Sequence, residues 1–322
     1  MTPRWLDPAA IERLAADPAR RMRMPAALAV DLSRPFVPEH YTQLYYTPIY
    51  LSLHREHRLR YNQLFGVRIN EYIMMLEDDL VERVLKPLRR HRNVAGDAAL
   101  VRCIDTMIAE EKHHYGCFAA LNRACFPALY GARERYFSLL PWPTRALFGA
   151  AGFFAGQLAF ALWYLMAMEE SSTALAREMA RSPSTETLGE IDPTFAAVHR
   201  EHLKDEQRHL QIDGLLVERC LAGGGRAARV LNAALFRSML GVVTRPTRAG
   251  SGIKVIRELL RQMPELAFRE KAMTRQVLAL RHDAGFQRSL FNRKAMPLTF
   301  GVFDRTAEFS DLANEMVGYD RR

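Results

Sequence analysis

The sequence lacks the features of several common protein classes. It has only four cysteines in 322 residues, and no two of them form a Cys-x-x-Cys pair. Cys103, Cys117, Cys125 and Cys220 lie in mostly apolar segments of helical pattern, which predicts buried thiols in a reducing compartment. The N-terminus has no apolar signal-peptide stretch. We therefore expect a cytoplasmic protein without a disulfide framework.

Lysine is also scarce, supplying only six of the 45 basic residues, and the net charge of +9 is scattered along the chain. The sequence has no zinc-finger, aromatic-basic or RNA-binding signature, so we expect no nucleic-acid partner. A basic balance can attract an anionic substrate or an acidic, ferredoxin-type electron donor. The simpler interpretation is a solvated surface in an arginine-rich proteome.

Strand signals are nearly absent. There is no long alternating run of β-branched residues and no Asn-Gly or Asp-Gly hairpin. Hydrophobic residues make up 49% of the chain, enough to bury a sizeable core. The sequence therefore predicts an all-α protein, in which residues 1–322 form one domain and residues 226–322 add helices packed against a bundle.

Helical patterns and their breakers place the elements. Asp192 and Pro193 suit the N-cap and first position of a helix, and three consecutive glycines, 223–225, end it. The other expected helices cover about Pro8 to Ala16, Tyr50 to Gln63, Arg68 to Arg90, Asp97 to Cys125, and a segment that ends near Arg181.

One apolar stretch resembles a membrane span. Between Ala146 and Met168 only Gln157 is clearly polar, and the length suits a bilayer. The stretch leads directly into Glu169 and Glu170, which fits a metal site better than a bilayer exit. A helix that is apolar on all sides can also be the central helix of a bundle. We therefore expect a buried helix and no membrane association.

Two short segments carry the chemistry. Glu111 and His114 form one Glu-x-x-His motif, and Glu206 and His209 form another, preceded by His202. Residues three and four apart share a helix face, so the last three make one stripe. Facing Glu-x-x-His helices, with one further Glu from each of two other helices, build the di-iron or di-manganese site of a four-helix bundle.

The two further carboxylates are less well defined. Glu77 follows an apolar run in the segment between residues 68 and 90, with Glu71 as the runner-up and Glu82 as a third candidate. The other carboxylate ends the apolar stretch and is either Glu169 or Glu170.

Neighbouring residues leave other assignments open. Glu110 and His113 form an overlapping Glu-x-x-His motif, but Glu111 and His114 align better with Glu206 and His209, because an acidic residue then precedes each ligand Glu. Glu110 and Asp205 become supporting or salt-bridging groups. His199 is expected on the surface. We likewise expect no ligand role for His54, His57, His91 and His282.

The third histidine of the second motif carries a resemblance. With Met107 at the equivalent position of the first motif, the order Glu, Glu-x-x-His, Glu, His-x-x-x-Glu-x-x-His resembles the p-aminobenzoate N-oxygenase family over about residues 65–215. The resemblance implies a ferritin-like bundle over about residues 65–222, two iron ions, O2 as co-substrate and oxidation of a small organic molecule. The ligands it implies are Glu77, Glu111, His114, Glu169 or Glu170, His202, Glu206 and His209.

The reaction remains open at this point. N-oxygenation of an amine is the leading hypothesis, and hydroxylation or desaturation of an apolar acyl chain is the alternative within the same chemistry. A ferritin-like ferroxidase without an organic substrate and a zinc or manganese hydrolase are further alternatives. Substrate, electron donor and oligomeric state, with a homodimer as one option, are not encoded in a recognisable pattern.

Overall fold

The computed structural model describes residues 5–221, 225–305 and 316–319. Within these ranges every long element is a helix, and β-structure is limited to the isolated bridges Ser184–Glu190 and Asn292–Gly318. The expected all-α class is confirmed.

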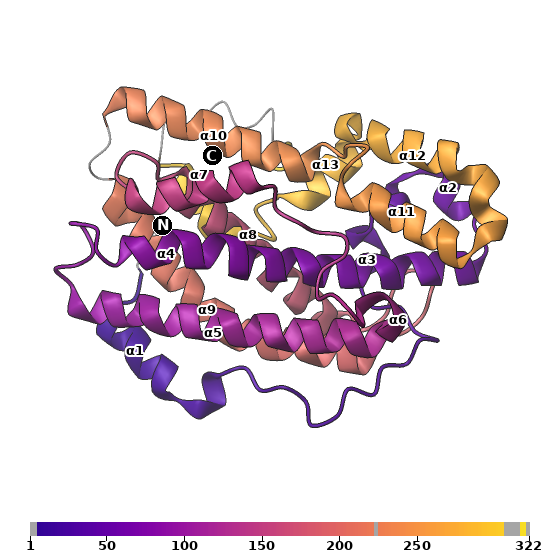
Figure 1. The fold of residues 1–322 in the computed structure, drawn as a ribbon, viewed down its shortest axis with the longest axis horizontal. Coiled ribbons are helices and arrows are strands. Elements are labelled where there is room, and N and C mark those ends of the chain that lie inside the picture. Colours follow the sequence, from indigo (N-terminus) through magenta and orange to yellow (C-terminus); the bar gives the residue numbers. More distant parts are fainter. Residues whose placement is uncertain (1–4, 222–224, 306–315, 320–322) are drawn as a thin grey trace.

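Four long helical segments form the centre of the molecule (Figure 1). In packing order around the bundle they are α3, α5, α9 and α8, and α8 returns to contact α3. Their bounds are α3, Arg55–Leu76; α5, Ala98–Cys125; α8, Phe160–Arg181; and α9, Pro193–Leu221.

The first of these segments is longer than the sequence pattern indicated. Two helices were expected, over Tyr50 to Gln63 and Arg68 to Arg90, but α3 runs unbroken through this junction. Gly66 lies against Phe36 of the N-terminal arm, where an added Cβ would approach the Phe36 Cβ to 2.8 Å. Gly66 therefore allows close packing against the N-terminal arm, and it does not interrupt the helix.

The same segment contains a wide turn. After α3 the chain forms one π-helical stretch, η4 (Glu77–Val81), and then continues as α4 (Glu82–Leu88). Single π turns inside α-helices are frequent at functional sites. This one begins at Glu77, the carboxylate that the sequence singled out.

The helices α5 and α9 begin where their capping residues predict. Asp97 accepts a hydrogen bond from the Leu100 backbone N–H at 3.0 Å, and Asp192 accepts one from the Phe195 N–H at 2.6 Å. These caps fix the start of each helix and therefore the register of its metal-binding motif.

The apolar stretch is divided between two helices, α7 (Trp142–Phe153) and α8, rather than forming one. The first of them, α7, packs closely against α4. At Gly152 an added Cβ would come within 2.7 Å of the Arg83 carbonyl oxygen, so only glycine fits there. Among the described residues no helix is long and apolar enough to cross a membrane.

The C-terminal helices cover the bundle. α10 (Arg226–Thr244) and α14 (Pro297–Phe303) pack on α8, while α11 (Ser251–Gln262) packs on α3. The other elements are α1, Pro8–Ala16; α2, Pro48–Leu51; α6, Pro127–Tyr130; α12, Glu270–Ala279; α13, Ala284–Leu290; and the short 3-10 turns η1, Pro18–Arg20; η2, Glu39–Tyr41; η3, Leu44–Tyr46; η5, Pro264–Arg269; and η6, Leu280–His282.

Candidate metal centre

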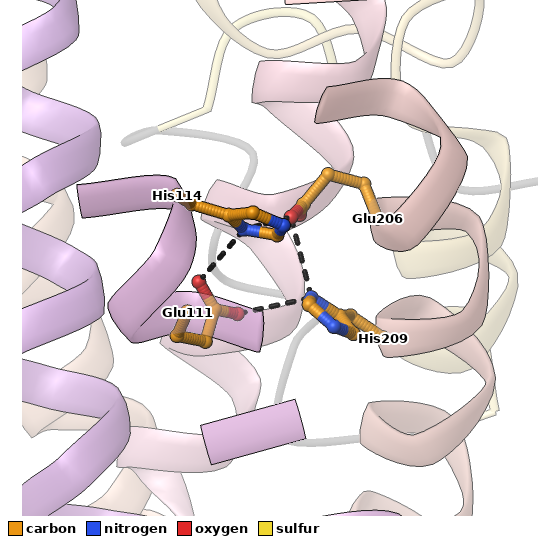
Figure 2. Close-up of side chains that lie close together, drawn as sticks. All are labelled: Glu111, His114, Glu206 and His209. Carbon is orange, nitrogen blue, oxygen red and sulfur yellow. Dashed lines mark ion pairs between the residues drawn. The ribbon is translucent and has the colours of Figure 1, made fainter. Parts of the chain in front are cut away.

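Two helices face each other with their motifs at the same height. Glu111 and His114 project from α5 toward Glu206 and His209 of α9, and the four side chains point at one another (Figure 2). Glu111 is 2% exposed, and the other three are fully buried. The distances are 3.0 Å from His209 Nδ1 to Glu111 Oε1 and 3.4 Å from His114 Nδ1 to Glu111 Oε2.

A second group shares His114 with the first. Glu77 of the π turn and His202 of α9 complete it, with 3.4 Å between His202 Nε2 and Glu77 Oε1. Glu77 Oε1 also lies 3.8 Å from His114 Nδ1. The two adjoining groups provide two neighbouring positions at which a cation can be bound.

Glu206 joins the two groups. Its Oε1 lies 3.0 Å from His202 Nε2, 3.2 Å from His209 Nδ1 and 3.5 Å from His114 Nδ1. One carboxylate oxygen is therefore central to all three imidazoles. Such a position would suit a carboxylate shared between two bound cations.

The donor atoms of this cluster have no ordinary hydrogen-bond partners. Both carboxylate oxygens of Glu77, Glu111 and Glu206 are buried without one, as are the inward nitrogens of His114, His202 and His209. Burying so many unsatisfied polar atoms is costly unless a cation compensates them. Carboxylate oxygens and imidazole nitrogens are ligands that suit iron, so the cluster fits a metal centre.

The structure separates Glu169 from Glu170. Glu169 lines the same cavity as Glu77 and His202, and the Glu206 carboxylate is near enough to act on the pKa of Glu169. Glu170 instead accepts hydrogen bonds from the backbone N–H groups of Leu298 and Thr299, at 2.9 and 2.7 Å. Its carboxylate therefore holds the start of α14, and only Glu169 faces the cluster.

Supporting carboxylates orient two of the imidazoles. His114 Nε2 donates to Asp205 at 2.8 Å, and His209 Nε2 donates to Glu110 at 3.0 Å. Arg208 Nη2 bonds both of these carboxylates at 2.6 Å. Such partners fix the ring orientation and leave the other nitrogen free to bind a metal. The carboxylates preceding the two motif glutamates thus support the histidine of the facing motif.

The electrostatics show what the cluster does without a metal. Burial raises the pKa of Glu77 to about 7, even though His202 acts in the opposite direction. Burial and the nearby carboxylates of Glu206 and Glu111 raise the pKa of Glu169 well above its usual range. Burial lowers the pKa of His202, but Glu206 and Glu77 outweigh it and raise that pKa to about 10. The raised pKa values of these groups favour bound protons in the metal-free cluster, and a bound cation would take their place.

This balance predicts a pH dependence of metal binding. Ligation requires Glu77 and His202 to lose their protons, so apparent affinity should rise with pH, by about tenfold per pH unit for each proton released. The Glu77 contribution should end above its pKa of about 7, and the His202 contribution should continue toward about 10. Cobalt titrations at pH 6, 7 and 8, with a pH indicator in weak buffer, measure both effects. Equal affinity at all three values would contradict the prediction.

The structure places His199 and Glu71 away from the roles considered for them from the sequence. His199 is not on the surface: it is buried, and its Nε2 bonds Asn70 Oδ1 at 2.9 Å. Glu71 accepts hydrogen bonds from Tyr130, Phe137 and Ser138 and lies outside the cluster.

Asp213 was not singled out, although it follows His209 by four residues on the same helix stripe, a signal that was available. Both of its carboxylate oxygens are buried without a hydrogen-bond partner. Burial raises its pKa well above the usual range, although His209 acts to lower it.

A large cavity that is open to solvent reaches the cluster, and its volume is about 980 Å³ when the adjoining solvent space is included. Glu77, Glu169 and His202 form its inner end. Arg68 lines it too, with its guanidinium over the ring of Tyr72 at 5.5 Å, and most of the remaining lining is apolar or aromatic. The centre is therefore accessible to a molecule larger than O2.

The chain matches the sequence profile of p-aminobenzoate N-oxygenase AurF over residues 7–250, which include every candidate ligand. The chain belongs to the AurF family. No curated protein gives a significant match. The AurF family has a ferritin-like helical fold and consists of di-iron oxygenases. The protein is therefore a ferritin-like oxidoreductase that acts on a small molecule, and the expected enzyme class is confirmed.

Proposed function

We propose that the protein binds two iron ions and uses O2 to oxidise an amine at nitrogen. The observation that carries this proposal is the buried cluster in which Glu206 joins two groups of unpartnered donors. The proposed ligands are Glu77, Glu111, His114, Glu169, His202, Glu206 and His209. Four carboxylates balance the charge of two divalent ions, so the loaded centre is neutral with neutral imidazoles.

Iron in such a centre supplies O2 chemistry, and the protein supplies position and access. Asp205, Glu110 and Arg208 hold the rings of His114 and His209 so that their inward nitrogens stay fixed. The apolar cavity admits a substrate and limits water at its inner end. These contributions suit oxidation of an organic molecule better than iron storage, which needs no such cavity.

The lining of the cavity also limits the range of substrates that would fit. Its inner end is acidic before metal binding, and Arg68 provides a cation between Phe65 and Tyr72, over rings at 5.1 and 5.5 Å. Arg68 Nε also donates to Ser251 at 2.8 Å, which fixes the guanidinium. An aromatic amine with an anionic group at its far end fits this arrangement, with the amine toward the metals and the anion at Arg68.

The proposal is tested by iron analysis combined with turnover. Protein reconstituted with Fe2+ under argon should hold about two irons per chain and, after exposure to O2, convert aromatic amines to N-oxygenated products. Zinc alone at the site, or O2 consumption without any product from amines, would contradict it. Oxidation of fatty acyl substrates in place of amines would support the alternative hydroxylase or desaturase function.

Removal of the third histidine is a sharper test. His202→Ala should retain the fold but lose about one iron per chain, because His202 belongs only to the group with Glu77. His113→Ala is the matched control, since His113 is exposed and lies outside the cluster. Iron analysis measures the bound metal of both variants, and far-UV circular dichroism measures whether they retain the fold. Unchanged iron in His202→Ala would contradict the assignment.

A further inference from the structure

A second hollow reaches the metal centre from different helices. It is open to solvent, and its volume is about 420 Å³ when the adjoining solvent space is included. It lies between the π turn with the start of α4 on one side and α5 on the other. Glu77 and Glu111 line its inner end. Among the residues that the structure describes, Glu77 is the one that lines both this hollow and the large cavity. Its carboxylate therefore separates two independent routes to the cluster.

The carboxylates of this second hollow form a graded series. Near solvent, the side chains of Asp78 and Glu82 are 44% and 30% exposed. At the inner end, the side chains of Glu77 and Glu111 are 4% and 2% exposed, and their oxygens have no hydrogen-bond partners. The acidic lining therefore continues from the surface to proposed metal ligands.

The π turn creates this series. In an α-helix, residues five apart point to different faces, but the i→i+5 hydrogen bonds of a π turn bring them toward one face. Glu82 thereby joins Glu77 along the hollow, although five residues separate them. A regular helix would turn Glu82 away from Glu77.

We propose that this hollow is a loading port through which Fe2+ reaches the centre, separate from the substrate cavity. The inference rests on the proposed di-iron function. Hard divalent cations prefer oxygen ligands, and a cleft lined by one sign of charge raises the association rate of the opposite ion. Asp78 and Glu82 attract the hydrated cation, and the inner carboxylates of Glu77 and Glu111 then bind it.

Lys112 opposes this movement. It lines the same hollow, its side chain is 61% exposed, and its Nζ lies 3.6 Å from Glu82 Oε1. Glu82 also pairs with Lys86, and Asp78 with Arg135. Exposed ion pairs of this kind are weak, so an arriving divalent cation can displace Lys112. Loading should therefore be slower with Lys112 present than without it.

The port is tested with variants that remove either its negative charges or its positive charge. Metal-free protein is mixed rapidly with Co2+, and the visible absorption of bound cobalt is followed at low salt. Asp78→Asn with Glu82→Gln should slow initial uptake by roughly tenfold, whereas Lys112→Gln should accelerate it by roughly threefold. Both differences should shrink in 0.5 M salt, because the charges are exposed. The final content should stay at about two ions per chain, since none of these residues belongs to the ligand cluster.

Glu218→Gln is the matched control. It removes a similarly exposed carboxylate on α9, twelve residues beyond Glu206, where Glu218 pairs with Arg305. Its uptake rate should equal that of the unmodified protein. Equal rates in all variants, with two ions bound, would overturn the port and leave the metal centre intact. Failure of the unmodified protein to bind two ions would instead overturn the proposed function itself.

Discussion

Glu206→Gln is expected to abolish binding at both metal positions. Glu206 Oε1 lies within 3.5 Å of a nitrogen of each of three imidazoles, so its charge serves both groups. Even residues that only hydrogen-bond to metal ligands contribute about 10- to 100-fold in affinity. Loss of this central ligand should therefore cost more than roughly 100-fold, and O2-dependent turnover should disappear with the metal.

The matched control is Glu201→Gln on the same helix. Glu201 accepts hydrogen bonds from the Arg23 N–H and from Lys204, and it lies outside the cluster. Metal content after dialysis and circular dichroism of both variants give the comparison. If Glu206→Gln bound two irons with unchanged affinity, the central position of this carboxylate would have no functional meaning.

Glu169→Gln and Glu170→Gln should have opposite effects, although the residues are adjacent. Burial raises the pKa of Glu169 well above its usual range, which favours the neutral carboxyl without metal, so a neutral amide should change metal-free stability little. Binding of metal requires the ionised form, so affinity should fall by roughly 100-fold or more, as for other ligands.

Glu170→Gln should instead lower stability and leave metal binding intact. The amide has one acceptor oxygen, whereas the Glu170 carboxylate accepts from both Leu298 and Thr299 at the start of α14. Loss of one such bond costs about 1–2 kcal/mol. Denaturant unfolding of the metal-free proteins and cobalt titration separate the two effects. A metal defect in Glu170→Gln, with normal binding in Glu169→Gln, would reverse the assignment.

Most of the site was predictable because its residues follow helix periodicity. His202, Glu206 and His209 form one stripe on α9, and the acidic residues before the two motif glutamates pointed to Glu110 and Asp205 as supporting groups. The structure adds that each of these supports the histidine of the facing helix. It also adds Arg208, which bonds both carboxylates. This support from the facing helix depends on how α5 and α9 pack together, which the periodicity within one helix cannot encode.

The π turn and the break in the apolar stretch were less predictable. A π turn contains about one more residue than an α-helical turn, and this changes the directions in which Glu77 and Glu82 point. No residue type marks such a turn in the sequence. The close packing of α7 on α4 depends on Gly152 lying against the α4 backbone, a contact between segments more than sixty residues apart. The local sequence pattern shows where the glycine is, but it does not show which segment packs against it.

The sequence by itself determined the helical class, the starts of α5 and α9, and the types and spacing of the donors, because capping and helix periodicity act between residues a few positions apart. Tertiary structure alone decided that Glu169 rather than Glu170 faces the centre. It also placed Glu77 between two separate cavities. Both outcomes depend on the relative position of distant helices, which decides whether a carboxylate meets the backbone N–H groups of α14 or the donor cluster.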